Sequence, residues 1–331
     1  MDDPRRIYEM LLDYCTGGAT VGYLTIGLVW TVCRESQSDN AGLCMSPGVP
    51  TRTLPWAGAL TGKPLSELAA GLMSWDPYQA CLAMAAVNCC INARSLPESE
   101  PLEATPGREN LAVFDYFLPL LCDKKVAVVG RYPGLELYRE QLDLTVLELN
   151  PEPGDLPAAA SEYVLPEADW VFLTGSSIPN KTFPRLAELS ESAVTVLMGP
   201  TVPWLPQWHE FGIDYLAGIE VTDADSLCET AGQGGGVRIF GNGVRYRVAE
   251  LSDRNSLAWL KTQIAECYAE KTRLTEAMEQ WYERGNTARF EAWQTLERVN
   301  ARLSRLDFGF KKAWDQTNSD FDCKNRRLSR A

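Results

Sequence analysis

The sequence contains a single histidine, His209, and none of its ten cysteines belongs to a C-x-x-C pair. Zinc ribbons and iron–sulfur clusters use closely spaced cysteines, so the sequence argues against both. One histidine also gives little basis for a histidine-rich zinc site or a Ser-His-Asp triad. Most of the cysteines lie in apolar stretches, which is typical of reduced thiols in a protein core.

Long hydrophobic runs and excess positive charge are missing as well. The longest apolar run, residues 19–33, has 15 residues, whereas a membrane-spanning helix needs about 20. Residues 1–6 show no charged-then-apolar leader. The formal net charge of -13 repels the phosphate backbone of nucleic acids. We therefore expect a cytoplasmic protein that binds neither a membrane nor a nucleic acid.

The chain of 331 residues is long enough for about two domains and an appendage. Its first part, residues 1–100, predicts an α+β domain. The expected elements are a helix over 7–14, a β-hairpin from strands at 21–33 and 42–46, and helices over 64–74 and 77–92. Prolines and acidic residues in 97–110 indicate a linker or domain boundary.

Residues 111–250 have a different hydrophobicity pattern, in which short apolar runs alternate with helical or loop segments. Uninterrupted apolar runs at this spacing predict a parallel sheet covered on both faces, as in a Rossmann-like domain. The runs are residues 125–129, 144–149, 170–173, 194–198 and 215–217. Near the end of this part, Asn242-Gly243 predicts a β-hairpin with a type I′ turn.

The third part, residues 252–331, predicts an antiparallel helical hairpin, because apolar residues recur at helical spacing on both sides of Gly285-Asn286. A two-helix hairpin buries only one seam, and the aromatic side chains here exceed what that seam requires. We expect the hairpin either to pack on its own chain or to mediate a homodimer or a contact with a protein partner. In the second case, the basic residues 324–330 would meet an acidic surface.

Candidate site residues follow the first two strands of the predicted parallel sheet. Gly130 permits a tight turn and lets a ligand approach the backbone, with Arg131 beside it. Tyr132 replaces the second glycine of G-x-G-x-x-G, which disfavours a dinucleotide. Glu148, at the end of the second strand, can accept hydrogen bonds from a ribose or a similar diol. A plain turn and a solvated strand-end carboxylate are the alternative interpretations.

Two further loops follow the third and fourth strands and carry uncharged donors and acceptors. Ligands bind at this edge of parallel sheets, although a helix cap or a rigid turn also explains some of these residues. The candidate ligand-binding residues are Gly130, Arg131, Glu148, Thr174, Gly175, Ser176, Asn180, Gly199 and Thr201.

The order of these motifs resembles that of the putative heavy-metal chelation family, over about residues 5–250. The resembling motifs lie at residues 57–65, 75–77, 85–88, 129–133, 148–151, 174–182, 198–203 and 211–218. The resemblance implies an N-terminal domain similar to that of enolase, followed by a Rossmann-like domain that is similar to methyltransferases. It also implies a site between the two domains, at the carboxyl edge of the sheet. The helices after residue 252 lie outside the family pattern.

The leading hypothesis is a protein of metal homeostasis that binds or processes a small molecule, such as a pterin-like or siderophore-like chelator. Its ligand would be a metal ion or a metal chelate, and whether it catalyses a reaction is left open. Direct metal ligands would come from scattered cysteines or from acids such as Glu35, Asp76 and Glu148. One alternative is a methyltransferase of the S-adenosylmethionine type. Another is a non-catalytic adaptor that uses its helical tail.

The cysteines provide the first prediction. Adjacent Cys89 and Cys90 lie in a predicted buried helix, where their side chains point apart and cannot easily join. Thiol counting under denaturing, non-reducing conditions should find all ten cysteines free. A substantially lower count would contradict the expectation of reduced thiols.

Overall fold

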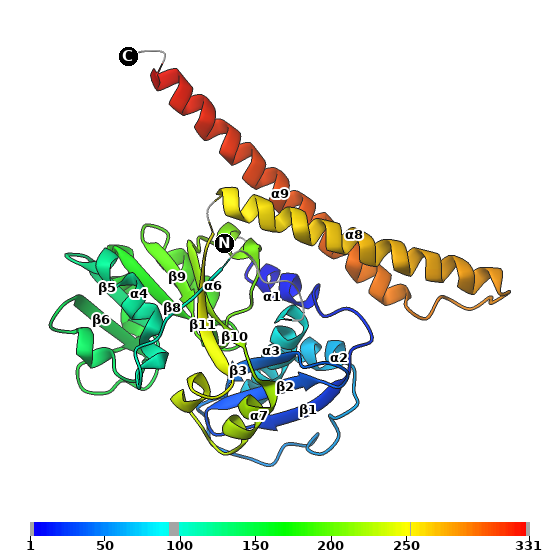
Figure 1. Cartoon of the computed structure of the whole chain (residues 1–331), viewed down its shortest axis with the longest axis horizontal. Helices are drawn as coiled ribbons and strands as arrows, with labels where there is room; N and C mark the ends of the chain where they lie inside the picture. Colours follow the sequence, from blue (N-terminus) through cyan, green and yellow to red (C-terminus); the bar gives the residue numbers. More distant parts are fainter. Residues whose placement is uncertain (1–2, 93–98, 252, 329–331) are drawn as a thin grey trace.

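The structure of the protein, a computed structural model, describes residues 3–92, 99–251 and 253–328, and in the last range it describes side chains from 257 to 314. It contains a three-stranded sheet, an eight-stranded sheet and a pair of long C-terminal helices. Figure 1 shows the two sheets next to each other, with the helical hairpin across one end of the molecule. This arrangement confirms the predicted mixed α/β fold with a parallel-rich sheet and a helical C-terminal region.

The N-terminal part is built around a three-stranded antiparallel sheet. Its elements are α1 (Arg5–Leu12), β1 (Val21–Ile26), β2 (Trp30–Glu35), β3 (Ala41–Met45), α2 (Leu65–Ala69) and α3 (Pro77–Asn92). The prediction of one strand over 21–33 is wrong, because the chain turns there and the Gly27 N–H donates to the Trp30 carbonyl at 3.0 Å. The residues of this turn are apolar, although Leu28 is 86% exposed. Composition therefore does not distinguish the turn from a strand.

Helix α3 lies directly on the backbone of β3. A Cβ atom on Gly42 would come within 2.1 Å of the Cys89 nitrogen, so glycine is what permits this approach. The buried side-chain amide of Asn88 donates to the Leu43 carbonyl at 2.7 Å and to the Thr201 carbonyl at 2.9 Å. Because Thr201 follows a strand of the large sheet, this one amide joins both sheets to α3.

The large sheet has the order β4-β11-β10-β9-β8-β5-β6-β7. Its strands are β4 (Glu100–Pro101), β5 (Lys125–Val129), β6 (Asp143–Glu148), β7 (Leu156–Pro157), β8 (Trp170–Thr174), β9 (Val194–Met198), β10 (Tyr215–Val221) and β11 (Val244–Glu250). The six strands β10, β9, β8, β5, β6 and β7 are parallel to one another. Strand β11 pairs antiparallel with β10, and β4 pairs antiparallel with β11. The chain leaves β5 towards β6 and β7 and then returns to β8, so the strand order reverses between β5 and β8.

Helices cover both faces of the large sheet and one also reaches the small sheet. They are α4 (Ala112–Leu121), α5 (Ser161–Val164), α6 (Phe183–Leu189) and α7 (Ala224–Gly232). Leu227 and Ala231 of α7 belong to the same hydrophobic core as Trp30 and Val32 of β2. Helix α7 therefore covers the face of the small sheet opposite α3, although about 190 residues of sequence separate it from β2.

One local prediction in this part needs correction. Asn242-Gly243 does not join two strands, because residues 237–240 form a 3₁₀ turn and the partner of β11 is β10. In that turn Ile239 is buried, whereas Val237 is 45% exposed. The segment expected as a linker, residues 97–110, contains the edge strand β4, while its first two residues lie outside the described part of the chain.

The C-terminal part is the predicted hairpin of α8 (Asp253–Glu283) and α9 (Trp293–Leu328). Gly285 between them has a φ of +81°, a backbone conformation that glycine adopts without strain. The buried seam consists of Leu260, Cys267, Leu274, Leu296, Val299, Leu303 and Leu306. In Figure 1 the C-terminal half of α9 projects away from the rest of the molecule.

A buried arginine anchors the hairpin to the N-terminal part. Arg302 of α9 is 1% exposed and pairs with Glu270 of α8. Its guanidinium also donates to the Asp13 carbonyl and to the Thr16 hydroxyl, each at 3.2 Å, and stacks over the Tyr14 ring. The hairpin therefore packs on its own chain, next to α1. The predicted basic contact at 324–330 lies outside the described side chains.

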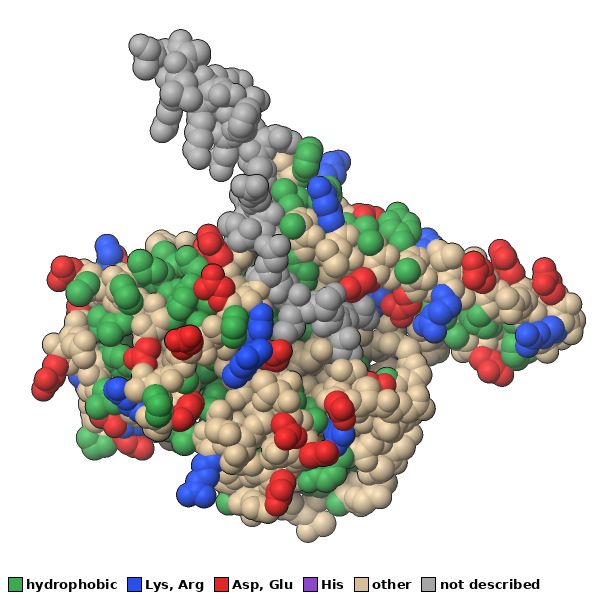
Figure 2. Space-filling view, in the orientation of Figure 1, with side chains coloured by type: hydrophobic (Ala, Val, Ile, Leu, Met, Phe, Trp, Pro, Cys, Tyr) green, Lys and Arg blue, Asp and Glu red, His purple; other side chains and the backbone are tan. Residues whose placement is uncertain are grey.

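The surface agrees with the acidic composition. Figure 2 shows acidic side chains both over the large sheet and at the far end of the hairpin. Within the described residues, no helix is both long enough and apolar enough to cross a membrane.

Replacing Arg302 tests the anchor. Arg302→Met keeps much of the side-chain volume but leaves Glu270 without its cation, and breaking a buried pair in this way costs about 3 kcal/mol. Urea denaturation should show that loss in the free energy of unfolding, and amides of α1 should exchange faster. Arg298→Met, at an exposed position of the same helix, should change stability by no more than about 0.5 kcal/mol. Equal stability of the two variants would refute the anchoring role.

Candidate functional site

The loops after β5 and β8 meet where the strand order reverses. Gly130 has a φ of +94°, and a Cβ atom there would lie 3.1 Å from the Thr174 side chain. The Thr174 hydroxyl lies 3.0 Å from the Ser176 hydroxyl and also caps the turn that follows β8. The structure therefore brings Gly130, Thr174 and Ser176 together at the carboxyl edge of the sheet, where open α/β folds bind ligands.

Tyr132 fills the space above this edge. Its hydroxyl donates to the Met198 carbonyl at 3.4 Å and lies 3.2 Å from the position of a Cβ atom on Gly199. Its ring packs edge-on against Phe114. Burial raises the pKa of Tyr132 above its usual range, although the Thr174 hydroxyl opposes this shift. The phenol is therefore a neutral donor.

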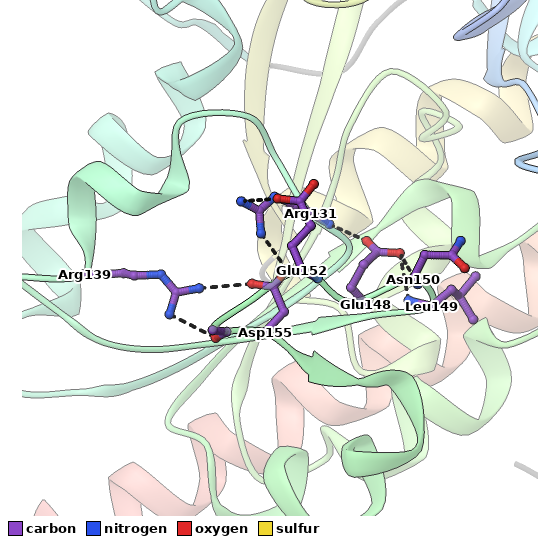
Figure 3. Close-up of polar contacts among 8 residues, drawn as sticks. Arg131, Arg139, Glu148, Leu149, Asn150, Glu152 and Asp155 are labelled. Carbon is purple, nitrogen blue, oxygen red and sulfur yellow. Dashed lines mark hydrogen bonds and ion pairs between the residues drawn. The ribbon is translucent and has the colours of Figure 1, made fainter.

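Glu148 holds the loops around β5 and β6 through backbone contacts. One carboxylate oxygen accepts from the Arg131 N–H at 2.7 Å. The other accepts from the N–H groups of Leu149 at 2.7 Å and Asn150 at 3.4 Å. Figure 3 shows the carboxylate turned towards these amides. In this structure the carboxylate expected to bind a diol therefore organises the loops.

Arg131 is also held by its own chain. Its guanidinium binds the carboxylates of Asp155 at 2.6 Å and Glu152 at 3.0 Å, as Figure 3 shows. The Asp155 side chain is fully buried and binds Arg139 as well, at 3.0 Å. Two guanidinium groups thus compensate one buried carboxylate, and they fix the loop between β6 and β7 against the loop after β5.

Thr201 and Gly175 lie where the loops of the large sheet meet the small sheet. The buried Thr201 hydroxyl accepts from the Met45 N–H at 3.0 Å. A Cβ atom on Gly175 would come within 2.9 Å of the Val202 nitrogen, so the loops after β8 and β9 touch there. Asn180 is exposed: its N–H donates to the Ser176 carbonyl at 3.3 Å, and its side-chain oxygen accepts from the Thr182 N–H at 3.1 Å.

Lys181, which is not among the residues predicted from the sequence, reaches into the junction between the sheets. Its ammonium group donates to the Leu72 carbonyl and lies 4.6 Å from the centre of the Tyr8 ring. Its φ of +71° is uncommon for a residue with a side chain, and such strain clusters at functional sites. Burial lowers the pKa of Lys181 to about 8, although the Cys44 thiol opposes the shift. A strained, partly desolvated lysine is a functional candidate.

Two cysteine side chains share this junction. The thiols of Cys44 in β3 and Cys81 in α3 both donate to the Met45 carbonyl, at 3.3 Å and 3.0 Å. Burial raises the pKa of Cys44 well above its usual value, and the neighbouring Cys81 adds to this rise. Thr201 and Lys181 act in the opposite direction. No spacing in the sequence reveals this pair, because one cysteine comes from a strand and the other from a distant helix.

The acidic residues considered as hard metal ligands are not gathered into one group. Glu35 accepts from the side chains of Ser38 and Asn40, and Asp76 accepts from N–H groups at the start of α3. Throughout the described part of the chain, no three His, Cys, Asp or Glu side chains form a group that could hold a metal ion.

A cavity of about 190 Å³ opens near the turn between β2 and β3. Its lining consists of Asp39, Asn40, Ala41, Asn92, Ile219, Glu220 and Val221. None of the predicted site residues lines it. It is smaller than the roughly 300 Å³ at which typical ligand pockets begin, and its acidic side chains do not suit an anionic ligand.

Glu148 can be tested directly. Glu148→Ala removes the acceptor of three backbone N–H groups, and the loss should lower the free energy of unfolding by about 1–2 kcal/mol. Glu152→Ala is the matched control, because its side chain is mostly exposed on the same loop. Thermal and urea denaturation would measure both variants. An unchanged stability for Glu148→Ala would show that the carboxylate is free for another role.

Comparison with known proteins identifies relatives. Two family models match, each described as putative heavy-metal chelation, over residues 8–91 and 112–250. A crystal structure of a protein of unknown function from Desulfitobacterium hafniense, assigned to the family of the second model, is 29% identical. It covers 76% of this chain and 100% of its own, with a TM-score of 0.66.

Two further comparisons add to this. A family member of unknown function from Pyrococcus horikoshii is 19% identical, with a TM-score of 0.59 over 75% of this chain and 99% of its own, and shows likeness of fold. An uncharacterised protein of Methanocaldococcus jannaschii is 33% identical over an alignment of 110 residues, and the match covers 31% of this chain and only 42% of that relative's length. The two family matches together take in more than half of the sequence, and the chain belongs to the putative heavy-metal chelation family.

Proposed function

We propose that the protein binds a small metal chelate, of pterin-like or siderophore-like size, between its two sheets and so serves metal homeostasis. The observation that carries this proposal is Lys181, a half-buried ammonium group in the loop after β8. A cation in surroundings of low polarity attracts an anion more strongly than one in water does. Chelators of hard and borderline metals are rich in negatively charged oxygen, so they match this charge.

The same edge of the sheet supplies directional hydrogen bonds. Thr174 and Ser176 present neutral hydroxyl groups near the reversal of strand order. A small number of fixed polar groups is what orients a ligand in a largely apolar site. The proposal is one of binding, and it assigns no reaction to these residues.

Analysis of the purified protein tests this function. Native mass spectrometry should detect a bound small molecule that is released on denaturation, and elemental analysis of the same sample should detect a metal in equal amount. A bound mass equal to that of S-adenosylmethionine would instead support the methyltransferase alternative. A protein that carries no small molecule and gains none from a cell extract would contradict the proposal and support the adaptor.

Removing the ammonium group sharpens the test. Lys181→Met keeps the aliphatic stem and loses a charged hydrogen bond, which is worth about 1.5–3 kcal/mol. Chelate affinity should therefore fall roughly ten-fold to a hundred-fold. Lys124→Met, at an exposed position before β5, is the matched control and should bind as the unmodified protein does. Equal affinities for the two variants would remove Lys181 from the site.

A further inference from the structure

Two pairs of cysteines lie between the small sheet and α3. Cys44 faces Cys81, and Cys33 faces Cys89. The described cysteines are all free thiols. Both pairs lie between the same sheet and the same helix, but the groups around them differ. Each pair can therefore serve as a control for the other.

The geometry of the first pair suits two ligands to one ion. Both sulfur atoms lie within hydrogen-bond distance of the same acceptor, the Met45 carbonyl oxygen. The two sulfur atoms therefore cannot be further apart than the sum of their distances to this oxygen, which are 3.3 Å and 3.0 Å. Cys44 is 0% exposed and Cys81 is 3% exposed, while Met45 at the end of β3 is 46% exposed. Both thiols are thus buried, and the residue that follows Cys44 reaches the surface.

Polar and positive groups surround the first pair. The Cys81 thiol lies 3.3 Å from the Thr31 hydroxyl, and the Thr201 hydroxyl faces Cys44. The Lys181 ammonium group interacts electrostatically with Cys44. A nearby cation favours the thiolate, which is the form of cysteine that binds metals.

The second pair has the opposite surroundings. The Glu35 carboxylate acts on Cys89 and disfavours a thiolate there. The Cys89 thiol donates to the Asn40 carbonyl at 3.3 Å. Burial is similar for both pairs, so the sign of the neighbouring charge distinguishes them.

We propose that Cys44 and Cys81 bind one thiophilic monovalent cation, of the Cu(I) type, through both sulfur atoms. Soft thiolate ligands select such ions, and the two thiol protons leave to solvent as the metal binds. Two thiolates, one monovalent cation and the Lys181 ammonium group then sum to zero charge, so burial carries little penalty. A tetrahedral zinc site would need further ligands that the described residues do not supply. The inference deepens the metal-handling function proposed above.

Silver(I) is a suitable probe, because it is monovalent, thiophilic and stable in air. It would be titrated into the full-length, reduced protein in competition with a soluble chelator, so that only tight sites fill. One equivalent should bind tightly. Cys44→Ser and Cys81→Ser should each weaken that binding at least a hundred-fold. The double variant Cys33→Ser with Cys89→Ser should bind as the unmodified protein does.

The controls separate this inference from folding defects and from the proposed function. Circular dichroism and the melting temperature would show that each variant is folded, and Lys181→Met should weaken silver binding while both thiols remain. Tight binding that survives in Cys44→Ser and Cys81→Ser, or that is lost equally in the Cys33/Cys89 variant, would overturn the inference. Binding of the organic chelate is measured separately. If the protein binds silver but no organic chelate, only the chelate proposal is refuted.

Discussion

The contact between α3 and β3 is the constraint on which the rest of this structure depends. Gly42 has no side chain, so the helix backbone rests on the strand backbone. That closeness lets the Asn88 amide reach the Leu43 carbonyl and the Thr201 carbonyl at once. A buried amide left without acceptors is costly, so the position of the loop after β9 is tied to the small sheet. The thiols, Lys181 and Thr201 meet because of this link.

Charge is handled differently at the two ends of the candidate site. Around β5 and β6, Asp155 is compensated by Arg131 and Arg139, and these groups fix the loops. At the junction of the sheets, Lys181 has a carbonyl and an aromatic ring as its neighbours. The first end is electrostatically complete, whereas the second holds a cation that interacts with the Cys44 thiol. This contrast is why the second end is the better candidate for an anionic or thiolate-bound ligand.

The sequence predicts regular elements well where burial repeats without interruption. The strands at 125–129 and 194–198 and the helix at 77–92 match the structure at both ends. It fails where apolar residues form a turn, as at 27–29, because composition then resembles a strand. The meeting of Gly130 with Thr174 follows from strand topology. The pairing of Cys44 with Cys81 depends on how a helix lies on a sheet, which no local pattern encodes.

The position of α7 has a consequence for the order in which the chain folds during its synthesis. The small sheet is built from residues 21–45, but one of its faces is covered by Leu227 and Ala231. While the ribosome is still making the intervening chain, that apolar face has no partner. Nascent chains fold from the N-terminus as domains become complete. This sheet instead has to wait for most of the large sheet, so its apolar face stays uncovered until α7 has been made.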